Sequence, residues 1–450
     1  MSDAQVFWSY DPALYTAPLY DPTSLAFRED PYPHYHRLRQ YDPVHFYMPA
    51  SCWILTRYHD VRSVLFDPRF GIALEWLEQS PYVSAQMQQP FNRIIRKQIL
   101  SGDPPAHTRI RAIMQRWFTP SKLDALRPVI QQSVDECINS ALEAGSFEFI
   151  SGFAYRMPFQ VVCQMMGVPN EERAPLEGFT HALMRSTDPT PMSPPELASC
   201  NAAAEGFRDY FLDLARRRHQ EITEAPAPVD IFSELVRARD QGQITEEEMI
   251  ANFILLFCAG HDTVVNLFGN GLLALHRNPD QLEILRNDPS LIRGAIEELL
   301  RYDTTLQIAR RTALEWVKVG GDSTGVNPNA GKWIGPSQYV VCCLGAANRD
   351  PEVFEDPDRL DVRRRNVKPL SFGGGIHTCL GAQLARIEGE IGFSTLLRRI
   401  PDLQLETLKP VWTQNTTIRS LASLPARCSG ANEPRPQPTE AQPQPTEPRP

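Results

Sequence analysis

Residues 371–381 of this chain read SFGGGIHTCLG, which places three consecutive glycines and a histidine just before a lone cysteine. A zinc site needs cysteines at C-x₂₋₄-C spacing, and a redox dithiol needs C-x-x-C. No second cysteine lies at either spacing from Cys379. The stretch therefore excludes both kinds of site, and leaves either a core cysteine or a thiol that acts alone.

The composition is that of an ordinary globular protein, with 42% hydrophobic and 22% charged residues in a chain of 450. This length allows two average domains or one large one. The formal net charge of −9 argues against nucleic acid as the main partner. The nine cysteines are odd in number and scattered through apolar segments, a pattern that is typical of reduced thiols buried in a cytosolic protein.

The N-terminal stretch MSDAQVFWSYDPALYTAPLY has neither the basic region nor the apolar region of a signal peptide. The longest apolar run, FILLFCA at 253–259, is far shorter than the roughly 20 residues that a membrane span needs. We therefore predict a soluble, cytoplasmic protein without a membrane anchor.

The spacing of apolar residues predicts a mainly α fold with a small β region. Residues 44–47 and 52–56 are predicted to form a hairpin, and 105–310 shows mostly the apolar spacing of helices. The last 22 residues repeat PQPTE and hold almost nothing apolar, so they cannot bury enough surface to fold. We expect an N-terminal extension (1–20), one large domain (21–428) and a disordered tail (429–450).

A long helix is predicted in the middle of the chain. Thr245 followed by Glu248 forms a capping box at its start, and Asn278 before a proline marks its end. The residues between them are apolar nearly all round, so we expect this helix to run through the core.

The centre of this helix contains AGHDT at 259–263, where a glycine and an aspartate are both unfavourable in a buried helix. One interpretation is a notch for helix packing at Gly260, with Asp262 at a solvent edge. The other is a functional site, in which the small residues leave room for a flat group. Thr263 would then bond back to the carbonyl of Ala259 and open the helix, while Asp262 would supply protons.

Glu298 and Arg301 fall at positions i and i+3 of another predicted helix, so they lie on one face. Most such pairs are solvated surface pairs that contribute little to stability. If this helix is buried, the pair needs further partners, and Arg359 in FEDPDRLDV is the candidate for a third member.

The opening stretch fits the pattern F-G-x-G-x-H-x-C-x-G in full. The matching residues are Phe372, Gly373, Gly375, His377, Cys379 and Gly381. The stretch resembles the haem-binding loop of the cytochrome P450 superfamily, in which a cysteine thiolate holds the haem iron. The resemblance covers roughly residues 20–428.

Four other blocks resemble the same family, in the same order along the chain. AGHDT resembles the oxygen-activation segment of its long central helix, and Glu298 with Arg301 resembles its ExxR pair. The segment at 347–361 resembles its meander, which would supply the third member of that core. DPPAHTRIR at 103–111 resembles the haem-propionate segment of the bacterial soluble members. The resemblance implies the cytochrome P450 fold, with haem between the central helix and the cysteine loop.

The resemblance implies haem b as the cofactor and Cys379 as the axial ligand of its iron, at the N-terminus of a helix. Ala259 and Gly260 would leave room for O₂ above the haem. Asp262 and Thr263 would form the catalytic acid–alcohol pair that delivers protons.

Further residues are implied in binding the haem. They are Phe372 and Gly373 in the loop, and His107, Arg111, Arg311 and His377 at the propionates. Arg310, beside Arg311, is a rival for the propionate role.

The implied activity is that of a haem-thiolate monooxygenase, which hydroxylates or epoxidises a bulky apolar molecule such as a fatty acid, terpenoid, steroid or polyketide. Electrons would come from separate proteins, a ferredoxin and a ferredoxin reductase, and the basic run at 363–368 is a candidate contact. Specificity would be set by segments 70–103, 187–195, 304–308 and 415–417. Two alternatives stay open: a peroxide-driven, desaturating or coupling member of the same fold, and a non-catalytic haem-binding protein.

Two positions depart from the family pattern. Val264 stands where a second hydroxyl often follows the active-site threonine, which removes one polar contact and leaves the acid–alcohol pair intact. Residues 321–335 form a polar, glycine-rich insertion that is expected as a surface hairpin or loop. A role at a partner interface is the alternative.

Overall fold

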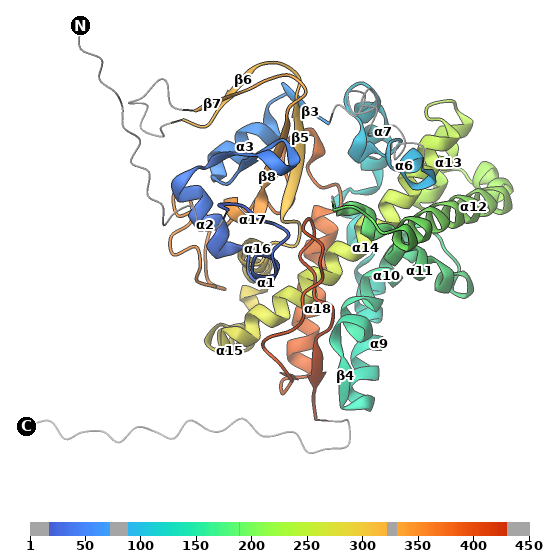
Figure 1. The fold of residues 1–450 in the computed structure, drawn as a ribbon. Helices are drawn as coiled ribbons and strands as arrows, with labels where there is room; N and C mark the ends of the chain where they lie inside the picture. Colours follow the sequence, from blue (N-terminus) through green and yellow to red (C-terminus); the bar gives the residue numbers. More distant parts are fainter. Residues whose placement is uncertain (1–17, 73–88, 189, 322–330, 430–450) are drawn as a thin grey trace, which may run out of the picture.

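The computed structural model describes residues 18–72, 89–188, 190–321 and 331–429. In Figure 1 a part that contains most of the strands, drawn in blue and orange, lies beside a larger helical part drawn in teal to yellow. This arrangement agrees with the prediction of a mainly helical chain with a small β region.

Some predictions concern segments outside the described residues. These are most of the N-terminal extension (1–20), nearly all of the tail (429–450), residues 73–88 of the expected specificity loop and residues 322–330 of the insertion. Where the insertion is described, β6 (Val317–Val319) pairs antiparallel with β7 (Lys332–Ile334). The flanks of the insertion therefore form the expected hairpin.

Helices account for most of the described chain, and α7 to α16 occupy the range that the apolar spacing predicts to be helical. The helices are α1 (Leu25–Glu29), α2 (Tyr32–Tyr41), α3 (Tyr58–Phe66), α6 (Pro90–Ile95), α7 (Ala106–Met114), α8 (Pro120–Asp124), α9 (Arg127–Ala144), α10 (Arg156–Met165), α11 (Arg173–Met184), α12 (Pro194–Glu224), α13 (Ile231–Asp240), α14 (Glu246–Arg277), α15 (Pro279–Asn287), α16 (Ile292–Tyr302), α17 (Leu344–Ala347) and α18 (Ala382–Arg399).

The strands form one five-stranded sheet and two smaller ones within the described ranges. The sheets have the orders β1-β2-β8-β5-β3, β4-β10-β9 and β6-β7. The remaining strand bounds are β1 (Val44–Tyr47), β2 (Cys52–Leu55), β3 (Phe70–Gly71), β4 (Ser146–Glu148), β5 (Ile308–Ala313), β8 (Tyr339–Cys343), β9 (Gln404–Leu405) and β10 (Pro425–Arg427). The short strand β4 interrupts the region predicted as helical.

The predicted hairpin of the first third is confirmed. Val44 pairs with Leu55 and Tyr47 pairs with Cys52 in antiparallel register. Strand β2 then runs parallel to β8, which joins the first third of the chain to a segment almost 300 residues later. A parallel pair cannot be closed by a short turn, so the helical part of the chain separates these two strands.

The central helix α14 begins and ends where the sequence predicts. The Thr245 hydroxyl accepts the N–H of Glu248 at 3.1 Å, and the Glu248 carboxylate accepts the N–H of Thr245 at 2.8 Å. Asn278 caps the other end. These two reciprocal bonds satisfy donors that a helix start otherwise leaves unpaired.

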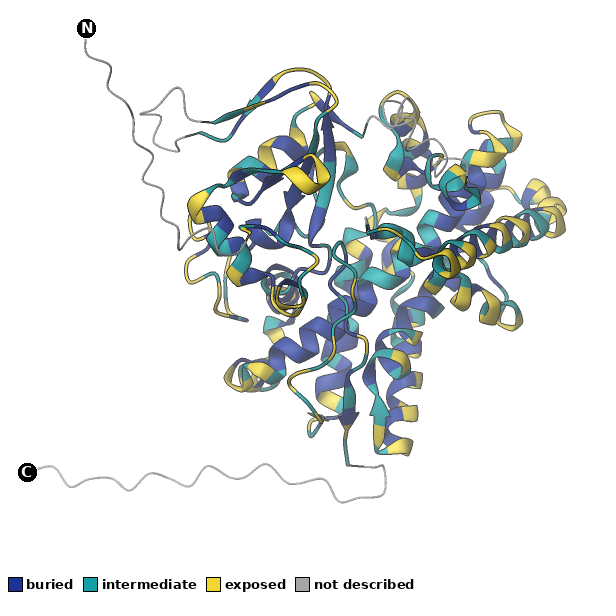
Figure 2. Ribbon diagram, viewed as in Figure 1, coloured by how far each residue is buried: buried dark blue, intermediate teal, exposed yellow. Residues whose placement is uncertain are grey.

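Most of α14 is buried, as its all-round apolar sequence predicts, and Figure 2 shows it in dark blue through the middle of the molecule. Among the described helices, α14 has the length and composition to cross a membrane, but most of its apolar stretch lies inside the protein. It is therefore the core helix of the fold.

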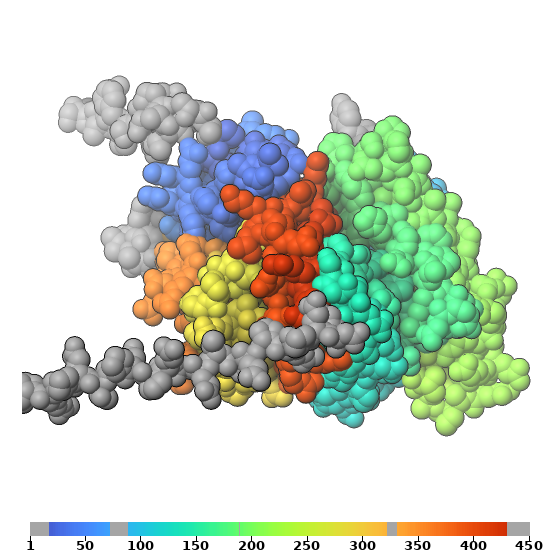
Figure 3. Space-filling model, turned by 90° about the horizontal axis from the view of Figure 1, so that it is seen from below, coloured from blue at the N-terminus to red at the C-terminus, as the bar shows by residue number. Residues whose placement is uncertain are grey.

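Helix α18 packs against α14 through glycines. The Phe268 ring occupies the space where a Cβ of Gly392 would stand, and a Cβ on Gly271 would lie 2.8 Å from the Phe393 ring. This close packing fixes the helix that follows the cysteine loop against the central helix. Seen from below in Figure 3, the C-terminal segment (red) lies between the N-terminal part (blue) and the helical part (teal and green).

Candidate active site: the cysteine loop and the central helix

The cysteine loop depends on two glycines with left-handed backbone. Gly373 has φ 69° and Gly375 has φ 67°, values that other residues rarely adopt. A Cβ on Gly375 would also collide with the carbonyl of Leu65 in α3. The N–H of Cys379 donates to the carbonyl of Phe372 at 2.9 Å, which closes the loop three residues before α18 begins.

The Cys379 side chain is exposed over part of its surface, and cationic groups lie near its thiol. Desolvation by the surrounding chain raises the pKa of this thiol, whereas the backbone N–H of Gly381 and the guanidinium groups of Arg111 and Arg386 lower it. Arg386 also lies over the ring of Phe372, 4.6 Å from its centroid. Donors and positive charge beside a sulfur are what a metal-ligating thiolate requires. In the described ranges no three His, Cys, Asp or Glu side chains converge as a metal site.

Two histidines beside the loop have buried ring nitrogens without a partner. His107, at the start of α7, is 2% exposed, and neither of its ring nitrogens has a hydrogen-bond partner among the described residues. The same holds for Nε2 of His377, whose ring centroid lies 4.5 Å from that of His107. Burial lowers the pKa of His377 to about 3, helped by the positive charges of Arg311 and Arg111. Two neutral imidazoles and two guanidinium groups thus form a donor-rich, cationic cluster.

Of the two neighbouring arginines on β5, Arg311 belongs to this cluster. Its side chain is buried, its Nη2 lies 3.5 Å from the carbonyl oxygen of Gly374, and its charge acts on His377. Arg310 is directed elsewhere, because successive residues of a strand point to opposite faces, and it contacts the hydroxyl of Thr417 at 3.4 Å. Arg111 donates to the carbonyl of Thr378 at 2.8 Å.

The centre of α14 shows features of both interpretations offered by its sequence. A Cβ on Gly260 would lie 3.0 Å from Cγ2 of Val162, so Gly260 does form a packing notch against α10. The Thr263 hydroxyl donates to the carbonyl of Ala259 at 2.9 Å, which confirms the predicted back-bond. Asp262 is half-buried, and desolvation raises the pKa of its carboxyl to about 6. A carboxyl that titrates near neutral pH can both take up and release protons.

The pKa of Asp262 makes a prediction about stability. Because the folded protein holds this proton more tightly than an unfolded chain, in which the pKa is 3.8, ionisation of Asp262 opposes folding. That opposition is absent below the unfolded pKa, grows between 3.8 and about 6, and is complete above about pH 6. Asp262→Asn should therefore raise the melting temperature by an increment that grows from about pH 4 to 6 and stays constant above that. Thermal unfolding at each pH measures it, with Asp280→Asn at the exposed start of α15 as control. A pH-independent increment would show that Asp262 is not desolvated.

Glu298 and Arg301 are fully buried and form a two-pronged ion pair, with Nε to Oε2 at 2.7 Å and Nη2 to Oε1 at 2.8 Å. The remaining donors of Arg301 reach the backbone carbonyls of Asn348 at 3.0 Å, Pro357 at 2.7 Å and Arg359 at 3.2 Å. All five N–H groups of a guanidinium are thereby satisfied. The interpretation as a surface pair is excluded.

The third member of this core is Arg364, so the prediction of Arg359 is wrong. Nε of Arg364 lies 3.1 Å from Oε2 of Glu298, whereas Arg359 contributes its backbone carbonyl. The physical reason is a local turn: the N–H of Asp361 donates to the Glu298 carboxylate, and the N–H of Arg364 donates to the carbonyl of Asp361, which brings the Arg364 side chain back to Glu298. Arg364 lies in the basic run at 363–368, which the sequence suggested as a partner contact. Because Arg364 was interpreted as part of that surface, its role beside Glu298 was missed.

Comparison with known proteins identifies the fold. The family model described as Cytochrome P450 matches residues 72–425 of the chain. The chain belongs to the cytochrome P450 family. Cytochrome P450 monooxygenase PikC of Streptomyces venezuelae is 35% identical over 412 residues, which is 89% of this chain and 92% of PikC. Polyketide biosynthesis cytochrome P450 PksS of Bacillus subtilis is 31% identical over 421 residues, covering 91% and 99%.

A solved structure of P450BioI in complex with hexadec-9Z-enoic acid ligated acyl carrier protein matches with a TM-score of 0.80 and 33% identity. It covers 90% of this chain and 99% of its own. The protein is thus a P450 enzyme, an oxidoreductase of the monooxygenase class with haem as its cofactor. The unpartnered imidazoles and the neighbouring guanidinium groups beside the cysteine loop fit such a group, because its two propionates are anionic acceptors.

The segments expected to set P450 specificity meet in the structure. Thr187 and Asp188 are joined to the loop at 415–417 by three hydrogen bonds, two of 3.0 Å and one of 3.4 Å. Two of these bonds are accepted by the buried carboxylate of Asp188, from the N–H and the hydroxyl of Thr416. The N–H of Gln307 donates to the carbonyl of Thr417 at 2.8 Å. Three of the four predicted segments are therefore joined by hydrogen bonds.

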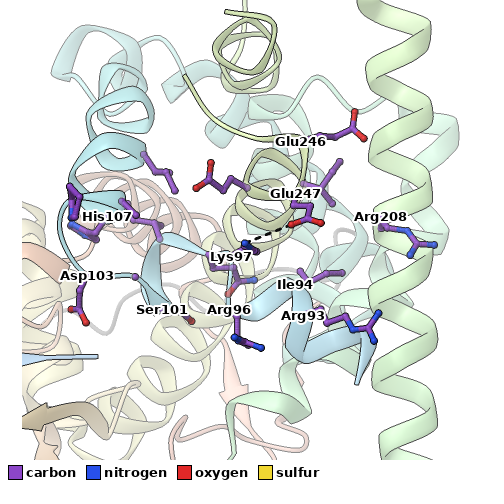
Figure 4. A pocket seen from close by; sticks show the side chains of 18 of the residues that line it. Arg93, Ile94, Arg96, Lys97, Ser101, Asp103, His107, Arg208, Glu246 and Glu247 are labelled. Carbon is purple, nitrogen blue, oxygen red and sulfur yellow. Dashed lines mark ion pairs between the residues drawn. The ribbon is translucent and has the colours of Figure 1, made fainter. Parts of the chain in front are cut away.

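A cavity of about 1010 Å³ opens between α6, α7, α12 and the first turn of α14 (Figure 4). His107 lines one end, and charges of both signs line the rest, including Lys97 and Glu247 at 3.7 Å. Neither Cys379 nor Asp262 lines this cavity. It therefore touches the edge of the site without containing the catalytic centre.

Proposed function

We propose that this P450 hydroxylates or epoxidises a bulky apolar small molecule with O₂, using Cys379 as the axial thiolate of haem b. The observation that carries the proposal is the pair of buried, unpartnered imidazoles, with the guanidinium groups of Arg111 and Arg311, beside the Cys379 loop. Such donors are stable in a protein interior only when an acceptor pairs with them. The proposal assigns that role to the propionates, which His107, His377, Arg111 and Arg311 would hold.

Haem held there would supply the redox chemistry, in which O₂, two electrons and two protons give one oxygen atom to the substrate and the other to water. The chain positions this chemistry. Phe372 and Gly373 would let the loop backbone approach the haem ring. Ala259 and Gly260, which have small side chains or none, would leave space between α14 and the haem. Asp262 and Thr263 deliver the protons that cleavage of the O–O bond consumes.

The proposed substrates are fatty acyl or polyketide compounds, with terpenoids and steroids as the remaining apolar classes. PksS is described as an enzyme of polyketide biosynthesis, and the P450BioI structure carries a fatty acid on its carrier protein. Residues 187–188, 304–308 and 415–417, which are joined by hydrogen bonds, offer one buried carboxylate and otherwise hydroxyl, amide and apolar side chains. Titration with members of each class, followed by the shift of the Soret band, tests the proposal. A shift only with small polar or ionic compounds would contradict it.

Electrons are proposed to come from a ferredoxin and its reductase, docking on the basic run before the cysteine loop. The sequence suggested Arg363, Arg364, Arg365 and Lys368, and the inward direction of Arg364 removes it from this surface. Arg363, Arg365 and Lys368 are exposed. Clustered charges of one sign steer an oppositely charged partner and make its binding salt-dependent.

We expect a triple variant that replaces Arg363, Arg365 and Lys368 with glutamine to be reduced by an acidic ferredoxin about tenfold more slowly at low salt. The reduction rate of this variant should also depend less on salt concentration. Stopped-flow reduction at several ionic strengths measures both effects. The matched control replaces three exposed basic residues elsewhere, Arg216, Arg398 and Lys409, with glutamine. Equal rates in the two triple variants would rule out this surface.

We further propose that residues 21–428 form a single catalytic domain and that the protein is soluble and cytoplasmic. Support comes from the family match over most of that range and from the absence of disulfides among the described cysteines. Free thiols persist in the reducing cytosol. Fractionation of cells that express the full chain tests this assignment.

A further inference from the structure

His261 connects the stretch of α14 that carries Asp262 and Thr263 to the start of α10. The His261 side chain is 0% exposed, and its ring centroid lies 4.1 Å from that of Tyr155 and 5.5 Å from that of Phe159. Its Nε2 lies 3.1 Å from the backbone carbonyl oxygen of Tyr155. Because a carbonyl oxygen can only accept, Nε2 carries the ring proton and donates it to this bond.

The Tyr155 carbonyl is available for this bond because the chain changes its type of helix there. A π-helical turn (Ile150–Ala154) ends before Tyr155, and α10 begins immediately after it. The helical bond that the Tyr155 carbonyl accepts from the N–H of Phe159 is stretched to 3.4 Å. His261 therefore supplies the shorter bond to this carbonyl. Turns of the π type are frequent at functional sites.

Packing alone does not explain an imidazole at this position. Nδ1 of His261 is buried and has no hydrogen-bond partner among the described residues, and such an atom costs free energy. A phenyl ring would fill the same space beside Tyr155 and Phe159 without that cost. Burial lowers the pKa of His261 to about 4, so the ring is neutral and keeps its Nε2 proton near neutral pH. Histidine thus adds one permanent donor to the Tyr155 carbonyl.

Ala259 and Thr263 lie on the opposite face of α14 from His261. Successive residues of a helix are rotated by about 100°, so a residue two positions away points about 160° from the first. The bond between the Thr263 hydroxyl and the Ala259 carbonyl is therefore on the face that is turned away from α10. Of the side-chain hydrogen bonds made by residues 259–266, all of which the structure describes, that of His261 is the one that reaches another element.

We propose that His261 is a positioning residue for the catalytic pair Asp262 and Thr263, an inference that rests on the proposed function. The notch at Gly260 sets how closely α14 approaches α10, but apolar contacts have no direction and leave α14 able to turn against its neighbour. The bond to the Tyr155 carbonyl is directional and fixes that rotation. Without the bond, the pair delivers protons less often, and reductant is consumed without forming product.

The first test measures the bond itself and needs no turnover. Histidines labelled with nitrogen-15 are observed by NMR in the reduced, carbon-monoxide-bound holoenzyme, and the His261 signals are assigned by their loss in His261→Phe. Nε2 should carry a proton that exchanges slowly with solvent, and Nδ1 should carry none, throughout the range from about pH 6 to 8. An imidazolium that titrates within this range, or a proton on Nδ1, would overturn the proposal.

The second test compares variants of His261 during turnover. His261→Phe keeps an aromatic ring without the donor, and should lower both the rate of product formation and the yield of product per reductant about tenfold. His261→Gln, whose amide nitrogen can reach the same carbonyl, should restore most of both. His261→Asn is one methylene shorter and should behave like His261→Phe. In all three variants the substrate concentration that gives half of the Soret shift should stay near that of wild type, because the bond does not contact substrate.

The matched control lies on the same helix. His276, near the end of α14, also places its Nε2 3.1 Å from a backbone carbonyl oxygen, that of Leu403, and His276→Phe should turn over like wild type. Equal rates and yields in His261→Phe and His276→Phe, or no recovery in His261→Gln, would overturn the inference. A wild type that forms no product with any electron donor would instead overturn the proposed function.

Discussion

Replacement of Arg301 by alanine should destabilise the folded protein by about 3–5 kcal/mol, the usual result of removing one partner from a buried ion pair. The variant would leave Glu298 charged in the core, with Arg364 as its remaining cation. The backbone carbonyls of Asn348 and Pro357 would also lose the Arg301 donor, whereas that of Arg359 would keep a bond from Arg364. Since typical stabilities are only 5–15 kcal/mol, much of the variant should be unfolded in cells and should fail to retain haem.

Urea denaturation followed by circular dichroism measures this effect, with two matched arginines for comparison. Arg359→Ala should lower the free energy of unfolding by less than about 1 kcal/mol. The Arg359 side chain lies outside the buried core, and its backbone carbonyl, which accepts from Arg301, is still present in the variant. Arg364→Ala should fall between the two. Arg301→Lys should remain strongly destabilised, because three ammonium donors cannot replace five in fixed geometry. Equal losses in Arg301→Ala and Arg359→Ala would contradict the assignment of the core.

Replacement of Asp262 by asparagine should lower the rate of product formation about 10²-fold or more, because general acid–base groups contribute 10²–10⁴. Asparagine keeps the shape of the side chain but cannot release a proton. Thr263→Ala should act differently: it removes the hydroxyl that bonds to Ala259, and should mainly reduce the share of consumed reductant that appears as product. The product formed and the reductant consumed are measured in the same reaction, at one fixed concentration of substrate and of O₂.

The exposed acid Asp280 supplies the control for Asp262→Asn, and Asp280→Asn should turn over like wild type. These variants also separate the two forms of catalysis that the sequence left open. A peroxide-driven enzyme would retain its rate and yield in Thr263→Ala. Full coupling in that variant, with activity sustained by peroxide alone, would contradict the O₂-dependent mechanism.

Local features of the sequence predicted local features of the structure well. The capping box at Thr245, the end of α14 and the back-bond from Thr263 to Ala259 depend on residues within one or two helical turns. The hairpin at 44–56 depends on alternation and a short connection. The lone cysteine among glycines indicated its own loop, because only the required backbone geometry explains that composition.

Contacts between distant segments were not predictable in the same way. Arg359 and Arg364 are both arginines near the end of the meander, and nothing in the spacing shows which side chain turns toward Glu298. The pairing of Asp188 with the loop at 415–417 joins residues that are 228 positions apart.

The central claim is that Cys379 supplies a thiolate to haem iron, and the difference spectrum of the reduced protein with carbon monoxide tests it most directly. Wild type should show the strongly red-shifted Soret band that thiolate ligation produces, and Cys379→Ala should lose it. Cys428→Ala, which changes another cysteine outside the site, should keep it. A band at the unshifted position in folded wild type, or a red-shifted band that persists in Cys379→Ala, would contradict the account.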